Sequence, residues 1–393
     1  MMAADFDLVV VGGGIHGAGV AQAAAAAGYQ ALLLEKSEFA HGTSSRSSKL
    51  IHGGLRYLET GQFSLVRESL TEREILLRIA PDLVRLVPFF LPIYRSTSRR
   101  PWQVRAGLAL YALLGKLKET ARFRRVHRGE WEALDGIETK DLQVVFQYWD
   151  AQTDDAALTR AVVRSAAELG ARVLRPAQFL SAERLEGGYR VLYHHQEREQ
   201  EIRCLALVNA AGPWVNRILD LVEPSPPKLG VDFVQGAHIV LQGKVERGIY
   251  YTEAPRDRRA VFIMPWEERT LVGTTETRFK GDPEGVRPLP EEIDYLLETF
   301  HRYFPAKDRE VLESFAGLRV LPKGRGLAFT RPREMVLFPD DRREPRLVTL
   351  YGGKLTAYRA SAQKVVRLLG RVLPVRVPVA DTTTLPLSVD GAE

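Results

Sequence analysis

The N-terminal glycine motif constrains the fold of this chain more than any other feature of its sequence. Gly12, Gly14 and Gly17 follow a run of valines and have the spacing G-x-G-x-x-G. At a strand-to-helix turn, the first glycine permits a tight turn, the second lets the backbone approach a pyrophosphate, and the third lets the helix pack on the strand. The N-terminus of the helix favours the negative charge of the phosphates. The motif therefore predicts a dinucleotide-binding strand–helix–strand unit.

The residues after the motif complete this unit. We expect a helix of small residues over 18–27 and a second strand over the apolar run 31–34, which ends at Glu35. A carboxylate about 20 residues after the glycines can accept hydrogen bonds from an adenosine ribose. Because strand, glycines, helix, second strand and acid occur in this order, we predict a bound cofactor rather than an ordinary glycine-rich turn.

Length and composition exclude several classes of protein. A chain of 393 residues is long enough for two domains with cores of their own. The single cysteine, Cys204, rules out an internal disulfide and fits a reducing cytosol. No cluster suggests a metal site, the N-terminus lacks the features of a signal peptide, and no apolar stretch approaches the roughly 20 residues that span a bilayer. The sequence predicts a cytoplasmic protein that is soluble or peripheral to a membrane.

Positive charge is concentrated between Arg95 and Arg128. This segment has ten Lys or Arg residues against one acid, Glu119, and it contains Trp102 and an apolar run. A basic helix within 101–125 either lies in a membrane interface or packs on the protein's own core with its arginines in water, and both interpretations stay open. The net charge of +6 is compatible with nucleic acid, but no RNA-binding motif accompanies it, so we expect no nucleic-acid partner.

The remaining pattern indicates a mixed α/β fold. Helical periodicity marks 62–79, 155–168 and 290–304, whereas alternating residues over 231–277 indicate an antiparallel sheet. The proline-rich run 88–94 is expected to be an edge strand or a connector. We predict one cofactor domain assembled from separate segments, with an antiparallel sheet and helices inserted between them.

A second stretch is too rich in hydroxyl groups, glycines and cations for a routine linker. It runs from Thr43 to Tyr57 as TSSRSSKLIHGGLRY. Hydroxyls and backbone amides hold a pyrophosphate, and Gly53 and Gly54 permit a flat ring to lie against the main chain. A nicotinamide enzyme does not require this second cradle. A serine-rich turn that caps a helix is the alternative explanation.

These motifs together resemble those of the FAD-dependent glycerol-3-phosphate dehydrogenases, within the wider glutathione-reductase-like, D-amino-acid-oxidase-type flavoproteins. The resemblance covers nearly the whole chain, and the stretch SSKLIHGGLRYL is especially specific to that family. The segments that carry it are 12–19, 43–59, 209–214, 236–238, 265–266, 273–275, 317–319 and 351–356.

The resemblance implies an α/β fold with a Rossmann-like FAD-binding domain and an inserted substrate domain of antiparallel β-sheet plus helices. The FAD-binding domain is expected to be discontinuous, with the segments 1–75, 145–230 and 312–393. The substrate-binding domain is expected to comprise 76–144 and 231–311. The family's C-terminal helical domain is expected to be absent, because the chain stops soon after the last flavin motif.

The resemblance also implies which residues bind FAD. We expect the cofactor to be non-covalent, because the sequence around His41 is a poor match to the region where related amine-oxidising flavoproteins attach flavin through histidine. No metal is implied. The residues expected to bind FAD are Gly12, Gly14, Ile15, Gly17, Glu35, Lys36, Thr43, Ser44, Ser45, Ser48, Lys49, Leu50, Ile51, Val173, Gly212, Trp214, Gly353, Lys354, Leu355 and Thr356.

The implied reaction is oxidation of sn-glycerol 3-phosphate to dihydroxyacetone phosphate, with hydride passing from C2 to flavin N5. Catalytic roles are expected for Arg56, His238 and Arg319. Arginine suits phosphate because its paired donors match the oxygens. The imidazole of His238 titrates near physiological pH and is the candidate proton acceptor, although a hydrogen bond to the substrate fits equally well. The residues expected to bind the substrate are Arg56, Tyr57, His238, Arg319, Arg331 and Lys354.

The resemblance further implies that electrons pass to a quinone, with the enzyme peripheral on the inner face of the cell membrane. A glycerol-3-phosphate oxidase that uses O₂ is one alternative. An amino- or hydroxy-acid oxidoreductase of the same fold is another, because a fold does not determine a substrate. The oligomeric state stays open, with a homodimer as one option.

Overall fold

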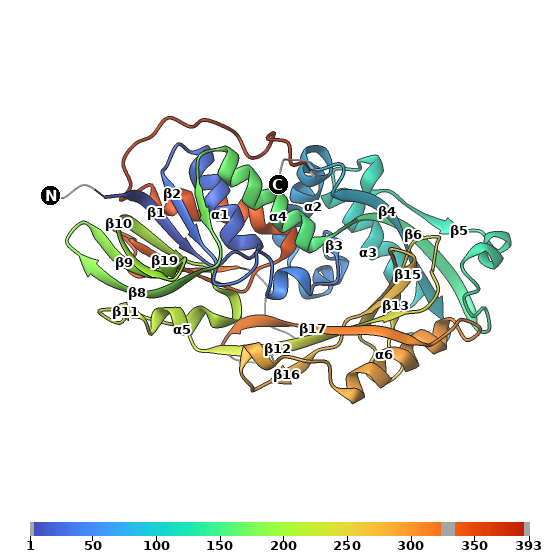
Figure 1. The fold of residues 1–393 in the computed structure, drawn as a ribbon. Coiled ribbons are helices and arrows are strands. Elements are labelled where there is room, and N and C mark those ends of the chain that lie inside the picture. The colour runs from blue at the N-terminus through green and yellow to red at the C-terminus, as the bar shows by residue number, and fades with distance from the viewer. Residues whose placement is uncertain (1–3, 324–334, 389–393) are drawn as a thin grey trace.

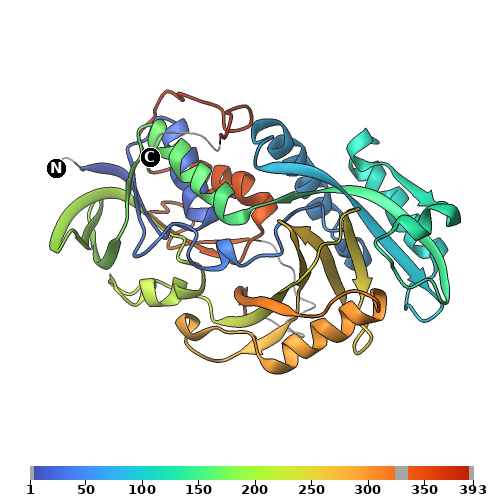
Figure 2. The ribbon, with the colours of Figure 1, turned by 45° about the vertical axis from the view of Figure 1, so that its right-hand side comes forward.

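Two β-sheets lie side by side in this protein. The computed structural model describes residues 4–323 and 335–388. Figure 1 shows the sheet of β1 (Phe6–Val11) on the left and the sheet of β4 (Val84–Tyr94) on the right, and the view turned by 45° shows the same division (Figure 2). This mixed architecture confirms the predicted α/β fold class.

The first sheet has the order β11-β8-β9-β10-β1-β2-β7, and β19 joins it beside β10 and is paired in turn with β18. Its centre is parallel: β1 pairs with β2 and β10, β2 with β7, and β10 with β19. Parallel strands are covered on both faces, which explains why residues 8–11 of β1 and all of β2 are apolar and buried. Besides β1, its strands are β2 (Ala31–Leu34), β7 (Arg172–Leu174), β8 (Ala177–Leu185), β9 (Gly188–His195), β10 (Arg198–Asn209), β11 (Val222–Glu223), β18 (Val336–Pro339) and β19 (Leu347–Tyr351).

Helix α1 (Ile15–Ala26) lies against this sheet and against two further helices, α4 (Asp155–Glu168) and α7 (Tyr358–Leu369). Because its side chains are small, neighbours approach it closely, and all residues from 17 to 26 are buried. Helix α4 begins where the sequence predicts, since the carboxylate of Asp154 accepts hydrogen bonds from the first backbone amides of the helix. The apolar core of this half therefore forms around α1.

The second sheet has the order β16-β12-β15-β14-β13-β4-β6-β3, with β17 paired to β12 and β5 paired to β6. It is antiparallel except where β13 meets β4. Helix α6 (Pro290–Tyr303) buries Leu296 and Phe300 against it. Besides β4, its strands are β3 (Leu50–Ile51), β5 (Phe123–Val126), β6 (Leu142–Thr153), β12 (Val231–Leu241), β13 (Ile249–Glu253), β14 (Ala260–Trp266), β15 (Arg269–Gly273), β16 (Thr277–Phe279) and β17 (Val311–Pro322).

The run 88–94 differs from the expectation of an edge strand or a connector. It forms most of β4, which lies inside the second sheet between β6 and β13. Prolines are tolerated there because β13 pairs with β4 only at Phe89 and Phe90, so the missing amides of Pro88 and Pro92 are not needed. The second sheet also includes all of β6 and β17, whereas the expected domain boundaries at 145 and 312 cut these strands.

The basic helix α3 (Pro101–Leu114) combines features of both interpretations. Its inner face buries Val104, Leu108 and Tyr111 in the core of the second sheet. Its outer face leaves Trp102 70% exposed and Leu113 61% exposed. Within the described part of the chain, no helix is long and apolar enough to cross a membrane.

Two ion pairs connect α2 (Phe63–Ile79) to α7 and so join two helices that lie far apart in the sequence. Glu72 and Arg359 form a doubly hydrogen-bonded pair whose side chains are about 95% buried, at 2.6 and 2.9 Å. One helical turn earlier, Glu68 pairs with Lys364 at 2.6 Å, but these side chains are partly exposed. In both pairs the carboxylate lies on α2 and the cation on α7. The two pairs therefore differ mainly in how deeply their side chains are buried.

This difference predicts unequal costs of removing the two carboxylates. Glu72→Gln leaves Arg359 buried without its counter-charge and should lower the free energy of unfolding by about 3–5 kcal/mol. Glu68→Gln, the control, should change it by about 1 kcal/mol or less, because water compensates an exposed cation. Urea denaturation followed by circular dichroism measures both. Equal effects of the two substitutions would contradict the assignment of α2–α7 stability to the buried pair.

Candidate active site

A cavity of about 540 Å³ lies between the two sheets. On one side it is bounded by the carboxyl ends of β1, β2 and β10 and by the turn after β19. On the other side it is bounded by β12, β14 and β17. Cofactors of open α/β sheets bind at the carboxyl ends of the strands, so this is the expected place for a dinucleotide.

The glycine turn after β1 is as tight as the motif requires. Gly12 has a φ of +109°, and a side chain there would lie 2.7 Å from the carbonyl oxygen of Ala210. A side chain at Gly17 would lie 1.8 Å from the carbonyl oxygen of Gly12. The first turn of α1 carries no acidic residue, so the positive end of its dipole stays available to an anion in the cavity.

Polar side chains hold this turn from both ends. The carboxylate of Glu35 accepts a hydrogen bond from the backbone amide of Gly13 at 2.7 Å and another from that of Ser37 at 2.9 Å. The hydroxyl of Ser44 accepts the backbone amide hydrogen of Ile15 at 2.9 Å. The Ser-rich stretch therefore meets the glycine motif at the N-terminus of α1.

The turn after β19 approaches the cavity in a similar way. Gly352 and Gly353 both have positive φ, of +74° and +104°. A side chain at Gly353 would lie 2.4 Å from Nε2 of His16. The ammonium group of Lys354 lies 3.6 Å from the ring centre of Tyr57, a cation–π contact. Close backbone approach at two separate glycine turns is what a long, partly flat cofactor needs.

Most of the residues predicted to bind FAD line this cavity. Those that do are Gly12, Gly14, Ile15, Glu35, Lys36, Thr43, Ser44, Ser48, Leu50, Gly212, Trp214, Gly353, Lys354, Leu355 and Thr356. Gly17 does not line it and contributes through the packing of α1 on the turn.

Besides Gly17, four predicted residues do not line the cavity. Lys49 is buried in an ion pair with Asp155 and donates to the carbonyl of Ser45 at 2.8 Å. Ser45 directs its hydroxyl to a local carbonyl. Ile51 is fully buried and pairs with β6, while Val173 pairs with Leu33. Each of these residues is held by a partner elsewhere in the fold or in its own turn. They therefore belong to the structure behind the cavity wall rather than to its lining.

Three arginines converge at the wall formed by the second sheet. Arg56 follows Gly54, which has a φ of +78°, and Arg319 comes from β17. Both are within ion-pair distance of Glu276, at 3.8 and 3.0 Å, and Arg259 pairs with the same carboxylate. Burial lowers the pKa of Arg319 to about 10, so this guanidinium is charged at neutral pH. The cavity is lined by four of the residues predicted to bind the substrate: Arg56, Tyr57, Arg319 and Lys354. A fifth, Arg331, lies outside the described residues.

His238 lies on β12 at the same wall and is 2% exposed. Its ring stacks on Phe315 with centres 5.0 Å apart, and its Nε2 is 3.0 Å from the hydroxyl of Ser48. It can lie across β15 only because Gly273 has no side chain, since a Cβ there would be 2.0 Å away. Burial, aided by the charges of Arg319 and Lys49, lowers the pKa of His238 to about 3. His238 is therefore neutral at physiological pH.

Sequence reasoning missed three residues of the site. Arg259 comes from the turn between β13 and β14, and Glu276 from the connection between β15 and β16. His16 lies inside the glycine motif, and burial lowers its pKa to about 4. Glu276 directly follows Gly273-Thr274-Thr275, so that motif was the available signal. Arg259 carries no comparable signal.

The residues present fit FAD. Gly12, Gly14 and the open N-terminus of α1 match a pyrophosphate, and a side chain at Gly14 would meet the hydroxyl of Ser44 at 3.1 Å. Side chains at Gly42 and Gly353 would likewise intrude on neighbours of the cavity, Trp214 and His16. Backbone is thus exposed to the cavity at both glycine turns.

Comparison with known proteins agrees with this geometry. The family model for the FAD-dependent oxidoreductases (DAO) matches residues 7–366. A glycerol-3-phosphate dehydrogenase of Pseudomonas aeruginosa is 41% identical over 93% of this chain and 71% of the relative. A D-erythritol 1-phosphate dehydrogenase of Brucella abortus is 39% identical over 94% and 74%.

Solved structures show the same fold. The glycerol-3-phosphate dehydrogenase of Bacillus halodurans, complexed with FAD, is 28% identical, with a TM-score of 0.73 over 98% of this chain and 68% of that chain. A glycine oxidase of Geobacillus kaustophilus is 17% identical with a TM-score of 0.70 over 99% of this chain and all of its own, which shows the fold alone. The chain belongs to the DAO family of FAD-dependent oxidoreductases.

Proposed function

We propose that this flavoenzyme oxidises sn-glycerol 3-phosphate to dihydroxyacetone phosphate. The observation that carries the proposal is the convergence of Arg56, Arg259 and Arg319 beside a neutral buried histidine. Relatives named for glycerol 3-phosphate and erythritol 1-phosphate both act on phosphate monoesters of polyols, which supports the phosphate assignment. Bound FAD would supply the oxidising power for removal of a hydride from C2 of the substrate.

The arginines bind and orient the phosphate in this proposal. A guanidinium presents paired donors to phosphate oxygens, and several such groups make a dianion tolerable away from bulk water. Lys354 and Tyr57, which contact one another, lie on the same cavity and add charge and a hydroxyl group. Fixing the phosphate end aligns the carbon chain for reaction, because an oriented substrate needs less ordering at the transition state.

His238 accepts the proton of the C2 hydroxyl group. Its neutral state at physiological pH leaves one ring nitrogen free to accept, and Nδ1 has no hydrogen-bond partner among the described residues. Ser48 fixes the ring through Nε2. The negative charge of a bound phosphate raises the proton affinity of the ring, so binding of the substrate improves His238 as a base.

FAD binding is assigned to the two glycine turns and the Ser-rich stretch. Gly12, Gly14 and Ser44 would hold the pyrophosphate at the N-terminus of α1, and Glu35 would accept a hydrogen bond from a ribose hydroxyl. Lys354 and the helical turn at 355–357 would supply positive charge to a bound flavin. These contacts would hold the cofactor without a covalent bond.

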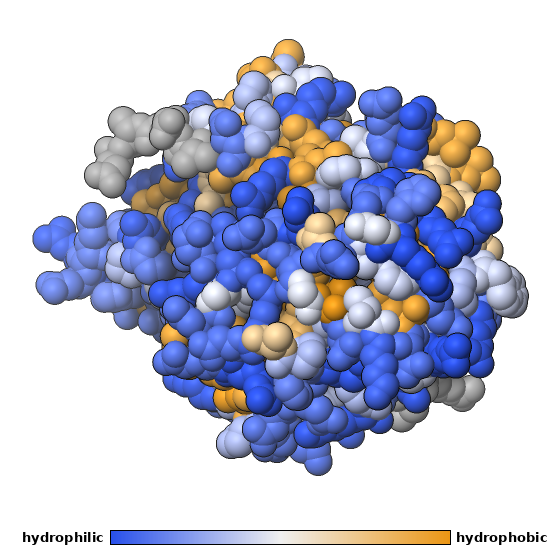
Figure 3. All heavy atoms as spheres, turned by 90° about the vertical axis from the view of Figure 1, so that its right-hand side faces the viewer, coloured by the Kyte–Doolittle hydropathy of each residue, from blue (hydrophilic) through white to orange (hydrophobic). Residues whose placement is uncertain are grey.

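The electron acceptor is a quinone in the membrane, and the outer face of α3 docks the enzyme there. Trp102, Ala106, Ala109 and Leu113 are exposed and lie at helical spacing, which makes one apolar stripe. Arg105 and Lys116 are exposed beside it and favour anionic lipid. The face on the right of Figure 1, near β5, is mostly hydrophilic with separate hydrophobic patches (Figure 3).

The substrate assignment predicts that sn-glycerol 3-phosphate, under anaerobic conditions, bleaches the visible absorbance of the bound flavin. Arg319→Met should raise the KM roughly 10- to 150-fold, because a hydrogen bond to a charged group contributes about 1.5–3 kcal/mol. Arg190→Met, which removes an exposed arginine of the β8–β9 hairpin, is the matched control and should leave KM unchanged. Wild-type enzyme that is reduced equally well by glycerol, or by an amino acid, would disprove the role of the arginines.

The acceptor assignment predicts faster turnover with ubiquinone in anionic vesicles than with dissolved O₂. Trp102→Ser combined with Leu113→Ser should abolish co-sedimentation with the vesicles and slow quinone reduction, while activity with a water-soluble dye stays unchanged. Burying each side chain contributes about 1.5–3 kcal/mol, so the loss should be large. Val375→Ser, at an exposed valine elsewhere, is the control. Rapid O₂ consumption without quinone reduction would instead identify an oxidase.

A further inference from the structure

One carboxylate occupies the centre of the arginine cluster. Oε1 of Glu276 is 3.0 Å from Arg319 and 3.8 Å from Arg56, and its other oxygen contacts Arg259. The side chain of Glu276 is only 5% exposed, whereas those of the three arginines are 26–32% exposed. The carboxylate is thus part of the wall, and the guanidinium groups reach the cavity in front of it.

The four residues come from four different segments. Arg56 follows the Gly53-Gly54 turn, Arg259 the β13–β14 turn, and Arg319 lies on β17. Like charges repel, and no local sequence holds these three side chains together. Glu276 supplies the attraction that keeps them directed at one point. A binding site whose donors are already arranged loses less entropy when its ligand enters.

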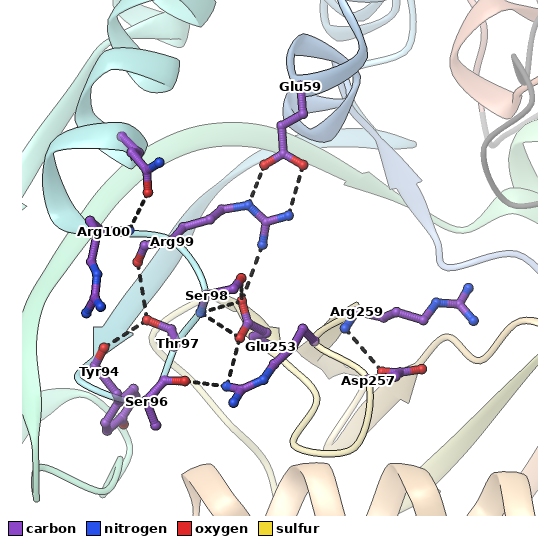
Figure 4. Close-up of polar contacts among 12 residues, drawn as sticks. Glu59, Tyr94, Ser96, Thr97, Ser98, Arg99, Arg100, Glu253, Asp257 and Arg259 are labelled. Atoms are coloured by element: carbon purple, nitrogen blue, oxygen red, sulfur yellow. Dashed lines mark hydrogen bonds and ion pairs between the residues drawn. The ribbon is translucent and has the colours of Figure 1, made fainter.

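The turn that presents Arg259 is itself anchored (Figure 4). The backbone amide of Arg259 donates to Asp257 at 3.2 Å, and Arg258 pairs with Glu253 at 3.3 Å. Figure 4 shows the guanidinium of Arg259 extending away from Asp257, so it is free of that local acid. The same close-up shows Glu253 bonded to Ser98 and Arg99, and Arg99 bonded to Glu59 on the helical turn that carries Arg56. The two arginine-bearing turns are therefore linked.

We propose that Glu276 is an internal counter-ion of the substrate site, that a phosphate monoester replaces it on the guanidinium groups, and that Arg259 is a phosphate-binding residue alongside Arg56 and Arg319. The inference rests on the proposed function for the identity of the ester. The replacement of Glu276 on the guanidinium groups does not depend on which ester binds, because inorganic phosphate presents the same oxygens.

The exchange has a defined effect on affinity. Glu276 arranges the arginines in the empty site but competes with the incoming dianion and repels it once it is bound. Phosphate binding is therefore weaker than three free arginines would give, and the phosphorylated product leaves more readily. Removal of the carboxylate should strengthen anion binding, whereas removal of Arg259 should weaken it.

The experiment uses purified holoenzyme and inorganic phosphate, with binding followed by ³¹P NMR line broadening at constant ionic strength. Glu276→Gln should bind phosphate roughly tenfold or more tightly than wild type, because a buried negative charge beside the anion is lost. Arg259→Gln should bind it roughly tenfold or more weakly. Glu276→Asp, which keeps the charge, should stay near wild type.

The matched controls are Glu313→Gln and Arg269→Gln, which break an exposed ion pair of the second sheet at 2.6 Å and should leave phosphate binding unchanged. FAD content and melting temperature identify any variant that fails to fold, in which case Arg259→Gln decides. Unchanged or weaker phosphate binding in folded Glu276→Gln overturns the proposal. The proposal is also overturned if Glu276→Gln loses affinity for sn-glycerol 3-phosphate but not for inorganic phosphate, because Glu276 would then bind the hydroxyl end of the substrate.

Failure of the proposed function is recognised separately. If sn-glycerol 3-phosphate leaves the flavin of wild type oxidised while phosphate binding changes as expected in Glu276→Gln and Arg259→Gln, the site is a phosphate site for another ester. If the flavin is bleached and phosphate binding does not change, the substrate is right and the exchange is wrong.

Discussion

The close packing of the backbone at the first glycine turn is the constraint on which the rest of the structure depends. Gly17 lies against the carbonyl of Gly12, and Gly12 lies against Ala210, so β1, α1 and β10 meet with no room for side chains. This contact places the N-terminus of α1 at the carboxyl edge of the parallel sheet. The cavity, the serine loop and the position of the second sheet all follow from where that edge lies.

The Ser-rich stretch transmits this constraint from one sheet to the other. Near its start, Ser44 bonds to the first turn of α1, and in its middle Lys49 pairs with buried Asp155 at the start of α4. At Gly53 the backbone amide donates to the hydroxyl of Tyr111, on the inner face of α3. The stretch therefore belongs to both halves of the molecule, and its fixed path presents Arg56 and Tyr57 to the cavity.

The two ends of the cavity differ in how they favour negative charge. At the parallel sheet the positive potential comes from the backbone dipole of α1, which does not titrate and needs no counter-ion. At the second sheet it comes from guanidinium groups that require a counter-ion, and Glu276 supplies one. His238 stays neutral because burial, aided by the charges of Arg319 and Lys49, lowers its pKa. One cavity thus combines a helix N-terminus at the parallel sheet with a cluster of guanidinium groups at the second sheet, and we propose that the first serves the cofactor and the second the substrate.

The sequence by itself determined what local geometry and periodicity control. The glycine spacing allowed the strand–helix–strand unit to be predicted, because a helix can approach a strand that closely only with glycine at fixed positions. The alternation over 231–277 predicted antiparallel strands. The Ser-rich stretch indicated a second cradle, and most of its hydroxyls that were expected at the site do line the cavity.

Tertiary structure decided what depends on partners distant in the chain. It placed the proline-rich run 88–94 inside the second sheet, because β13 pairs only between the two prolines. It turned Lys49 away from the site, because Asp155, far along the chain, offers a buried counter-charge. It also brought Arg259 and Glu276 to the cavity. The local sequence does not predict this contact, because it does not show whether a charged side chain is surrounded by water or paired with another buried charge.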